Sequence, residues 1–206
     1  EPAGANCMQE SLKEGKVVTL PSVNTIADGT AVKRPGDLLF PYIQINVDDI
    51  ITIEDSELIV AFLDMVENHK MIVENSGLLT VAALKHLNVK KKKVVSILSG
   101  GNMDVITMAS IVQHGLIQRD RVFTVSVLLP DKPGELAKVA TLMAAEQGNV
   151  IKLEHNQFVS INRNAAVELR ITVEAFGTDH KNKIVEALKE AGYRPKLVKS
   201  KNIYDV

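Results

Sequence analysis

The segment VELRITVEA, residues 167–175, decides how the C-terminal part of this chain folds. Its apolar side chains alternate with polar or charged ones, the pattern of a β-strand that has one buried face and one wet face. The run FTVSV at 123–127 repeats that alternation and predicts a second strand of the same kind. We therefore expect a sheet that is covered on one face and solvated on the other.

Two amphipathic helices are expected beside these strands. The first is marked by apolar residues at i, i+3, i+4 and i+7, namely Leu136, Val139, Ala140 and Met143. The other expected elements are a turn at 147–149, a strand at 150–158, a turn at 162–164, a helix at 179–191 and a strand at 194–199. The resulting order is β-α-β-β-α-β, the split-βαβ or ferredoxin-like arrangement, and we assign 121–206 to one domain.

Residues 1–117 follow a different plan, in which helices alternate with strands. Helices are expected at 5–13, from a cap at Asp55 or Ser56 through Met65, at 74–87 and at 105–113, and strands at 48–53 and 94–98. Such alternation is typical of an α/β layer with a parallel sheet. Two strands are too few for a parallel sheet, so 1–117 is interpreted as part of a domain rather than a whole one.

The bulk composition narrows the class of protein. There are 24 basic and 25 acidic residues, which favours neither nucleic acid nor an anionic membrane as a partner. The sequence shows no membrane-spanning apolar run and no signal peptide. A single cysteine suits a reducing compartment, so we expect a cytoplasmic protein. The chain opens at Glu1-Pro2 without an initiator methionine, and we expect it to be a processed product or part of a longer chain.

Two glycine-containing turns could bind ligands. Ser99-Gly100-Gly101-Asn102 lies between an expected strand and an expected helix, where free N–H groups and a positive dipole end favour an anion or a cofactor. The segment 131–136, DKPGEL, offers a similar turn to a carboxylate. For both turns the alternative is a plain strand-to-helix connection, capped in the first case by Asn102 or Asp104. The five histidines lack metal-ligand spacing, and adjacent Asp48 and Asp49 are interpreted as solvated, so no metal site is predicted.

Taken together, these motifs resemble threonine dehydratase (threonine ammonia-lyase), a pyridoxal-phosphate enzyme of the tryptophan-synthase-β type. The resemblance rests on an ordered set of segments: 1–2, 26–29, 48–50, 74–77 and 99–102. Residues 123–198, which include PDKPGEL at 130–136, are similar to an ACT domain. The implied fold is the C-terminal part of the pyridoxal-phosphate catalytic domain, at 1–117, followed by one ACT regulatory domain.

The resemblance also implies roles for individual residues. Ser99 matches the serine whose hydroxyl meets the pyridine nitrogen of the cofactor, Gly29 lines the cofactor pocket, and Glu74 lies near the ring. Gly100 and Asn102 complete the cofactor-binding set, Asn102 by supporting the turn. A neutral hydroxyl leaves the pyridine nitrogen unprotonated and the ring a weaker electron sink, which suits elimination of a β-hydroxyl. The residues that match the effector site are Asp131, Pro133, Gly134, Glu135, Leu136, Asn149, Val150 and Ile151.

The sequence departs from the family at several points. No segment matches the family's cofactor lysine motif or its glycine-run phosphate loop, so the chain is not expected to form the Schiff base alone. Related enzymes bind a divalent cation through positions matching Glu1, the Ala5 carbonyl and residue 7, and Cys7 is not a carboxylate. We therefore expect no metal there.

The function that the resemblance implies is conversion of L-threonine to 2-oxobutanoate and ammonia, in isoleucine biosynthesis or threonine catabolism, with pyridoxal 5'-phosphate as the cofactor and serine as a second possible substrate. Isoleucine or valine is expected as effector, and a homo-oligomer is expected through the ACT domains. Two alternatives stay open: a regulatory amino-acid-binding module without catalysis, and a serine racemase or serine dehydratase.

Overall fold

The computed structural model describes residues 1–156 and 167–198, and these fall into two compact units, 1–112 and 113–206. Each unit is built around its own apolar core. The division falls within α5 (Val105–Gln118), whereas the predicted domains, 1–117 and 121–206, meet after it. Within the described residues, no helix is long and apolar enough to span a membrane.

The second unit contains the sheet that the alternating segments predict. Its strands are β1 (Val122–Leu129), β2 (Asn149–Asn156), β3 (Val167–Glu174) and β4 (Lys196–Val198), in the spatial order β2-β3-β1-β4. All three pairings are antiparallel, and Val125 of β1 lies between Ile171 and Leu197. The β-α-β-β-α-β order is thus confirmed, while the turn expected at 162–164 lies outside the described residues.

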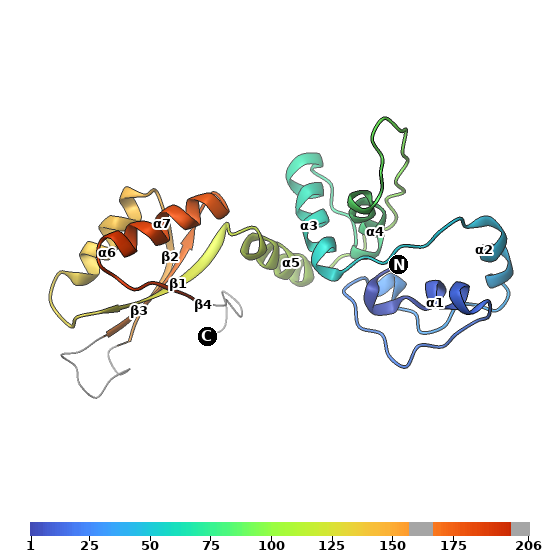
Figure 1. Ribbon diagram of the computed structural model, residues 1–206, viewed down its shortest axis with the longest axis horizontal. Helices are drawn as coiled ribbons and strands as arrows, with labels where there is room; N and C mark the ends of the chain where they lie inside the picture. The colour runs from blue at the N-terminus through green and yellow to red at the C-terminus, as the bar shows by residue number, and fades with distance from the viewer. Residues whose placement is uncertain (157–166, 199–206) are drawn as a thin grey trace. The chain divides into compact units, whose positions relative to one another are not determined.

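Helices α6 (Glu135–Ala145) and α7 (Thr178–Glu190) lie on the same side of this sheet (Figure 1). Their buried residues, including Val139, Met143, Ile184 and Leu188, pack against the alternating apolar face of β1 and β3. Full burial of each such side chain contributes roughly 1.5–3 kcal/mol. The opposite face of the sheet is polar, with Thr124 and Thr172 hydrogen-bonded across the strands at 2.9 Å.

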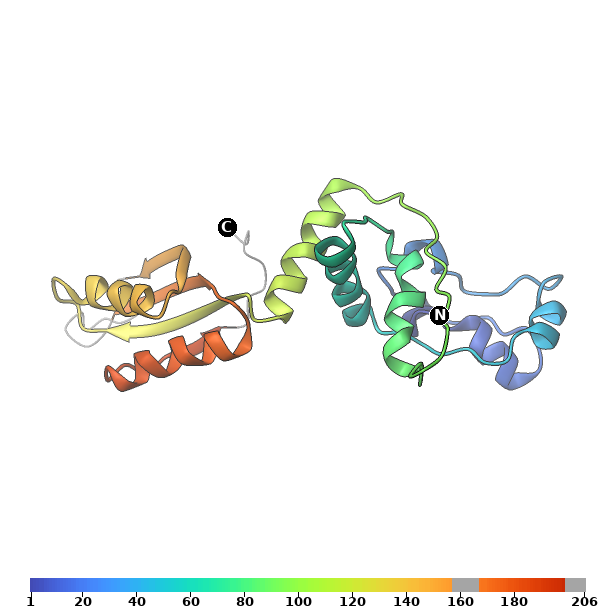
Figure 2. The ribbon, with the colours of Figure 1, turned by 90° about the horizontal axis from the view of Figure 1, so that it is seen from above.

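All named secondary-structure elements of the first unit are helices. Its α-helices are α1 (Cys7–Glu14), α2 (Phe40–Asn46), α3 (Asp55–Asp64), α4 (Leu79–Ala82) and the start of α5. Single-turn helices lie at Ala3–Ala5, Asp28–Thr30, Met65–His69, Asn75–Leu78 and Ala83–His86. Ile53, Leu58, Phe62 and Leu78 are at the centre of its core, each almost fully buried. Figure 2 shows α3 and α4 from above.

Two predicted strands are wrong for this structure. Residues 48–53 form only an isolated bridge, between Pro2 and Ile53, and 94–98 form no strand. Val95 and Ile97, predicted to be buried, are 89% and 72% exposed. The physical reason is that a parallel strand exists only when neighbouring strands satisfy its backbone groups, and the described part of 1–112 supplies none.

The start of α3 also differs from the prediction in detail. Glu54, not Asp55 or Ser56, is the N-cap, and it forms a capping box with Glu57. Asp55 instead accepts hydrogen bonds from Thr25 Oγ1 at 2.6 Å and from the Ile26 N–H at 3.0 Å. This contact holds the 25–28 loop against α3, and that loop forms one wall of the site described next.

Candidate functional site

The predicted cofactor residues gather around the carboxylate of Glu74. Glu74 stands immediately before the helical turn Asn75–Leu78 and is half-buried. Its Oε2 accepts a hydrogen bond from the Asn102 N–H at 3.2 Å, and its own N–H donates to the Gly100 carbonyl at 3.4 Å. The 74–77 and 99–102 segments, far apart in sequence, are therefore held side by side.

Glycines make this close approach possible. A β-carbon on Gly100 would lie 2.1 Å from Glu74 Oε1, and the residue has a φ of +76°. A β-carbon on Gly77 would lie 2.0 Å from the Ser99 carbonyl oxygen, and one on Gly29 would lie 2.9 Å from Ser76 Oγ. The structure thus brings Gly29, Glu74, Gly100 and Asn102 together, and Ser99 meets Gly77 at the same place. Ser99, Gly100 and Asn102 are exposed.

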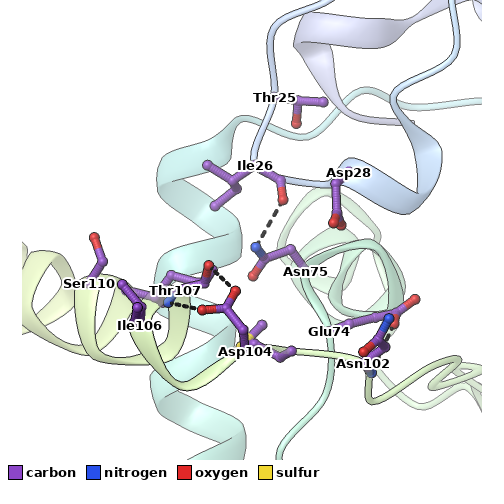
Figure 3. A pocket seen from close by; sticks show the side chains of 12 residues that line it. Thr25, Ile26, Asp28, Glu74, Asn75, Asn102, Asp104, Ile106, Thr107 and Ser110 are labelled. Carbon is purple, nitrogen blue, oxygen red and sulfur yellow. Dashed lines mark hydrogen bonds between the residues drawn. The ribbon is translucent and has the colours of Figure 1, made fainter.

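A pocket of about 490 Å³ opens next to Glu74, and we call it the Asn75 pocket (Figure 3). It is lined by Thr25, Ile26, Asp28, Glu74, Asn75, Asn102, Met103, Asp104, Ile106, Thr107, Ser110 and Ile111. Only Glu74 and Asn102 of these belong to the predicted cofactor set. Asp28 lies in the 26–29 segment but was not predicted to have a role, and no signal in the sequence marks Asn75 as buried.

Asp104 immediately precedes α5, and it was one of the two residues expected to cap this helix. Its carboxylate accepts hydrogen bonds from the Thr107 N–H, at 2.9 Å, and from the Thr107 hydroxyl. These bonds, led by the one from the hydroxyl, hold the pKa of Asp104 below its ordinary value. Asp104 is therefore ionised at neutral pH and contributes negative charge to the pocket.

The carboxylate of Glu1 binds backbone N–H groups in the first turn of α1. The two carboxylate oxygens accept hydrogen bonds from the N–H groups of Met8 and Gln9, at 2.9 and 2.8 Å. The neighbouring Cys7 is buried, and burial raises the pKa of its thiol. In residues 1–156 and 167–198 no cluster of histidine, cysteine, aspartate and glutamate is arranged to hold a metal.

In the second unit, part of the predicted effector loop borders a groove of about 750 Å³. Gly134, with a φ of +92°, turns the chain into α6. Glu135 accepts hydrogen bonds from Lys138 Nζ at 2.6 Å and from Tyr193 Oη at 3.3 Å, which ties α6 to the segment before β4. Gly134, Glu135, Lys138 and Tyr193 all line this groove, whereas Asp131, Pro133 and Leu136 are exposed beside it. Lys138 and Tyr193 were not predicted.

The other predicted effector residues, Asn149, Val150 and Ile151, lie at the far end of the sheet. Asn149 pairs with Glu174, which pairs with Val122 at the start of β1, whereas the loop at 131–136 follows the end of β1. At about 3.4 Å per residue, the length of β1 separates the two groups by roughly 20 Å. A single chain does not bring them together.

Comparison with known proteins identifies the class first. Residues 1–100 match the family described as pyridoxal-phosphate dependent enzyme. The solved structure of the processed form of threonine deaminase isoform 2 from Solanum lycopersicum is similar, with a TM-score of 0.51 and 32% identity. That likeness covers 54% of this chain and 34% of that one. Residues 1–100 are therefore similar to the pyridoxal-phosphate dependent enzymes.

Two similar curated proteins are both named L-threonine ammonia-lyase. The chain is 35% identical over 201 residues to the L-threonine ammonia-lyase of Geobacter sulfurreducens, covering 97% of this chain and 50% of that relative. It is 32% identical over 192 residues to the L-threonine ammonia-lyase of Thermotoga maritima, covering 93% and 48%. The predicted resemblance to the C-terminal part of threonine dehydratase is thus confirmed. The chain spans about half the length of the curated relatives it matches.

Proposed function

We propose that this chain is the C-terminal part of a pyridoxal-phosphate-dependent threonine ammonia-lyase, which converts L-threonine to 2-oxobutanoate and ammonia. The observation that supports this most is the convergence of Gly29, Glu74, Gly100 and Asn102 within the segment that matches the family. These residues come from three separate segments, around 29, 74 and 100–102, and the function explains why they meet.

The cluster fits a flat aromatic cofactor. Gly100 lets the Glu74 carboxylate pack against the 99–102 turn. Ser99, Gly100 and Asn102 are exposed, so that a planar ring could approach this turn. Ser99 would meet the ring nitrogen with its hydroxyl, and the Asn102 N–H fixes the Glu74 carboxylate beside the ring. When bound, pyridoxal phosphate delocalises the charge that is left when the α-proton of the amino acid is removed. The lysine and the phosphate loop would come from a segment that this sequence does not contain.

A chimera tests this function. The N-terminal half of the Geobacter sulfurreducens relative, fused before Glu1, would supply the lysine and the phosphate loop. We expect the fusion to bind pyridoxal phosphate and to form 2-oxobutanoate from threonine, whereas residues 1–206 alone should do neither. A Ser99→Ala fusion should retain its fold and lose most of its activity.

We further propose that residues 121–206 form an ACT domain that binds isoleucine or valine between two copies of the chain. β2 is an edge strand, and Val150 and Ile151 on it are 37% and 47% exposed. Antiparallel pairing of two β2 strands reverses one sheet relative to the other. The loop end of one copy would then lie next to the Asn149 end of its partner, which would unite the two halves of the predicted effector site.

Sedimentation and calorimetry test the regulatory part. We expect residues 1–206 to dimerise and to bind isoleucine or valine. Each loop at 131–136 should contribute to one site, so that a dimer binds two ligands. If the chain stays monomeric at every concentration, the shared site is excluded. If it binds no amino acid, the regulatory role fails while the catalytic proposal stands.

Two other functions remain open to the same experiments. A regulatory module without catalysis is favoured by the absence of a cofactor lysine motif, and it predicts amino-acid binding with no cofactor absorbance in the fusion. A serine racemase or serine dehydratase would convert serine, which chiral analysis of the products detects. The reported relatives named L-threonine ammonia-lyase match the chain over both units, which favours the threonine enzyme.

A further inference from the structure

The Asn75 pocket carries an excess of negative charge. Asp28, Glu74 and Asp104 all line it, and none of its twelve lining residues is a lysine, arginine or histidine. Glu74 is engaged with Asn102, and Asp104 with Thr107, but each carboxylate has further lone pairs that can accept hydrogen bonds. The pocket therefore attracts cations and repels anions.

An unsatisfied acceptor lies in its wall. Asn75 is only 4% exposed, and its Nδ2 donates to the Ile26 carbonyl at 2.9 Å. That bond fixes the orientation of the amide, so its Oδ1 is an acceptor, and among the described residues this oxygen has no hydrogen-bond partner. Figure 3 shows the oxygen turned away from Ile26, toward the side where Asp104 and Thr107 lie. Buried polar atoms are nearly always paired, so an unpaired one aimed into a pocket indicates a donor that comes from a ligand.

The residues that line the pocket indicate which kind of ligand would supply the hydrogen-bond donor to Asn75 Oδ1. A divalent metal needs several oxygen ligands in a tight shell, and no described cluster provides them. An amino acid would bring its own carboxylate next to Asp28, Glu74 and Asp104 without a compensating base. A primary ammonium group carries a positive charge and three N–H donors on one atom, which can reach Asn75 Oδ1 and a carboxylate together.

The remaining lining fits a short hydrocarbon tail. Ile26, Met103 and Ile111 are apolar, and a volume of about 490 Å³ exceeds what an ammonium ion fills. Pockets of roughly 300–1,000 Å³ usually bind small organic ligands. We propose that the Asn75 pocket binds a small primary alkylammonium ion, with its N–H groups on Asn75 Oδ1 and its charge balanced by Asp28 and Glu74. The pocket shares Glu74 and Asn102 with the proposed cofactor site, but binding of an alkylammonium ion does not depend on the proposed catalysis.

Calorimetry with three probes on the 206-residue chain tests the ligand class, at constant ionic strength. We expect n-propylammonium chloride to bind with a defined stoichiometry of one. Tetramethylammonium has the same charge and no N–H donor, and we expect at least tenfold weaker binding. Alanine, which adds a carboxylate, should also bind at least tenfold more weakly. No binding of n-propylammonium, or equal binding of tetramethylammonium, would overturn the proposal.

Variants test the location. Asn75→Leu keeps the size of the side chain and removes the acceptor, so we expect at least a tenfold loss of n-propylammonium affinity. Asp28→Asn removes one charge at an exposed position and should weaken binding about threefold or more, even if Asn75→Leu does not fold. The matched control is Asn46→Leu, because Asn46 donates to the Tyr42 carbonyl on α2, is exposed and does not line the pocket. Unchanged affinity in Asp28→Asn, or equal losses in Asn46→Leu and Asn75→Leu, would contradict this location.

Discussion

Gly100 and Glu74 lie so close together that no other residue fits at position 100 without moving the carboxylate. A β-carbon on Gly100 would be 2.1 Å from Glu74 Oε1 and 2.1 Å from Glu74 Cδ. The same carboxylate holds the Asn102 N–H at 3.2 Å. The position of Glu74 in the candidate cofactor site therefore depends on the absence of a side chain two residues before Asn102.

Gly100→Ala should displace Glu74 more than it destabilises the fold. An alanine with φ near +76° costs about 1–2 kcal/mol, and the end of the Glu74 side chain can swing aside. We expect the Asn102 amide resonance to move toward the position of a solvent-bonded N–H in NMR spectra. Cofactor affinity in the fusion should fall at least tenfold.

Gly15→Ala is the matched control for that variant. Gly15 has a φ of +67°, but a β-carbon there meets nothing within 4 Å. It should lose similar stability in denaturant unfolding and leave both the Asn102 resonance and cofactor affinity unchanged. Equal effects of the two variants on cofactor affinity would mean that the Gly100–Glu74 contact is irrelevant.

Ser126→Ala should change how stability depends on pH. Ser126 Oγ donates to Glu168 Oε1 at 2.7 Å, and this bond, opposed by partial burial and aided by Arg170, lowers the pKa of Glu168. A lowered pKa adds stability that is fully present above the ordinary value of 4.5 and is lost as pH falls through the folded-state pKa. The variant should therefore be less stable by about 1 kcal/mol near neutral pH.

The difference between wild type and Ser126→Ala should shrink in acid, because protonated Glu168 no longer gains from the bond. Urea unfolding at several pH values measures this, and a carboxyl NMR titration should show the pKa of Glu168 rising toward its ordinary value. A stability difference that is constant down to pH values below the titration would show that the serine contributes only packing.

Gly134→Val should weaken binding of isoleucine or valine, if the loop at 131–136 holds the effector. Gly134 has open space around it and a φ of +92°, so valine both strains the turn and covers the groove. We expect at least a tenfold loss by calorimetry. Gly15→Val, an equally open positive-φ position in the first unit, should leave effector affinity unchanged. Unchanged affinity in Gly134→Val would place the effector elsewhere.

The sheet was predictable because each strand is marked by an alternating pattern within its own sequence. Val167 to Glu174 and Val122 to Leu129 alternate, and each finds its partners within the same unit. The prediction of parallel strands at 48–53 and 94–98 was wrong for the opposite reason. A parallel strand forms only beside neighbouring strands, and a β-branched composition does not show that such neighbours exist. Helix α2 was not predicted, since only Phe40 and Ile43 mark its inner face, and the apolar Tyr42 and Ile45 between and after them are 68% and 81% exposed.

The candidate site was predictable only in part. Gly29, Glu74 and Asn102 were found by resemblance to a family, because no local pattern joins residues so far apart. Asn75 was missed, since a polar residue at a helix start is ordinarily solvated, and only the packing of the 25–28 loop buries it. Tyr193 was missed as well, because its hydrogen bond to Glu135 joins residues 58 positions apart.

The most direct test of the central proposal is a threonine assay of the chimera in which this chain follows the N-terminal half of the Geobacter sulfurreducens relative. We expect cofactor absorbance and 2-oxobutanoate formation, both strongly reduced by Gly100→Ala and unaffected by Gly15→Ala. A well-folded chimera that binds pyridoxal phosphate but forms no oxo acid from threonine or serine would contradict the proposal.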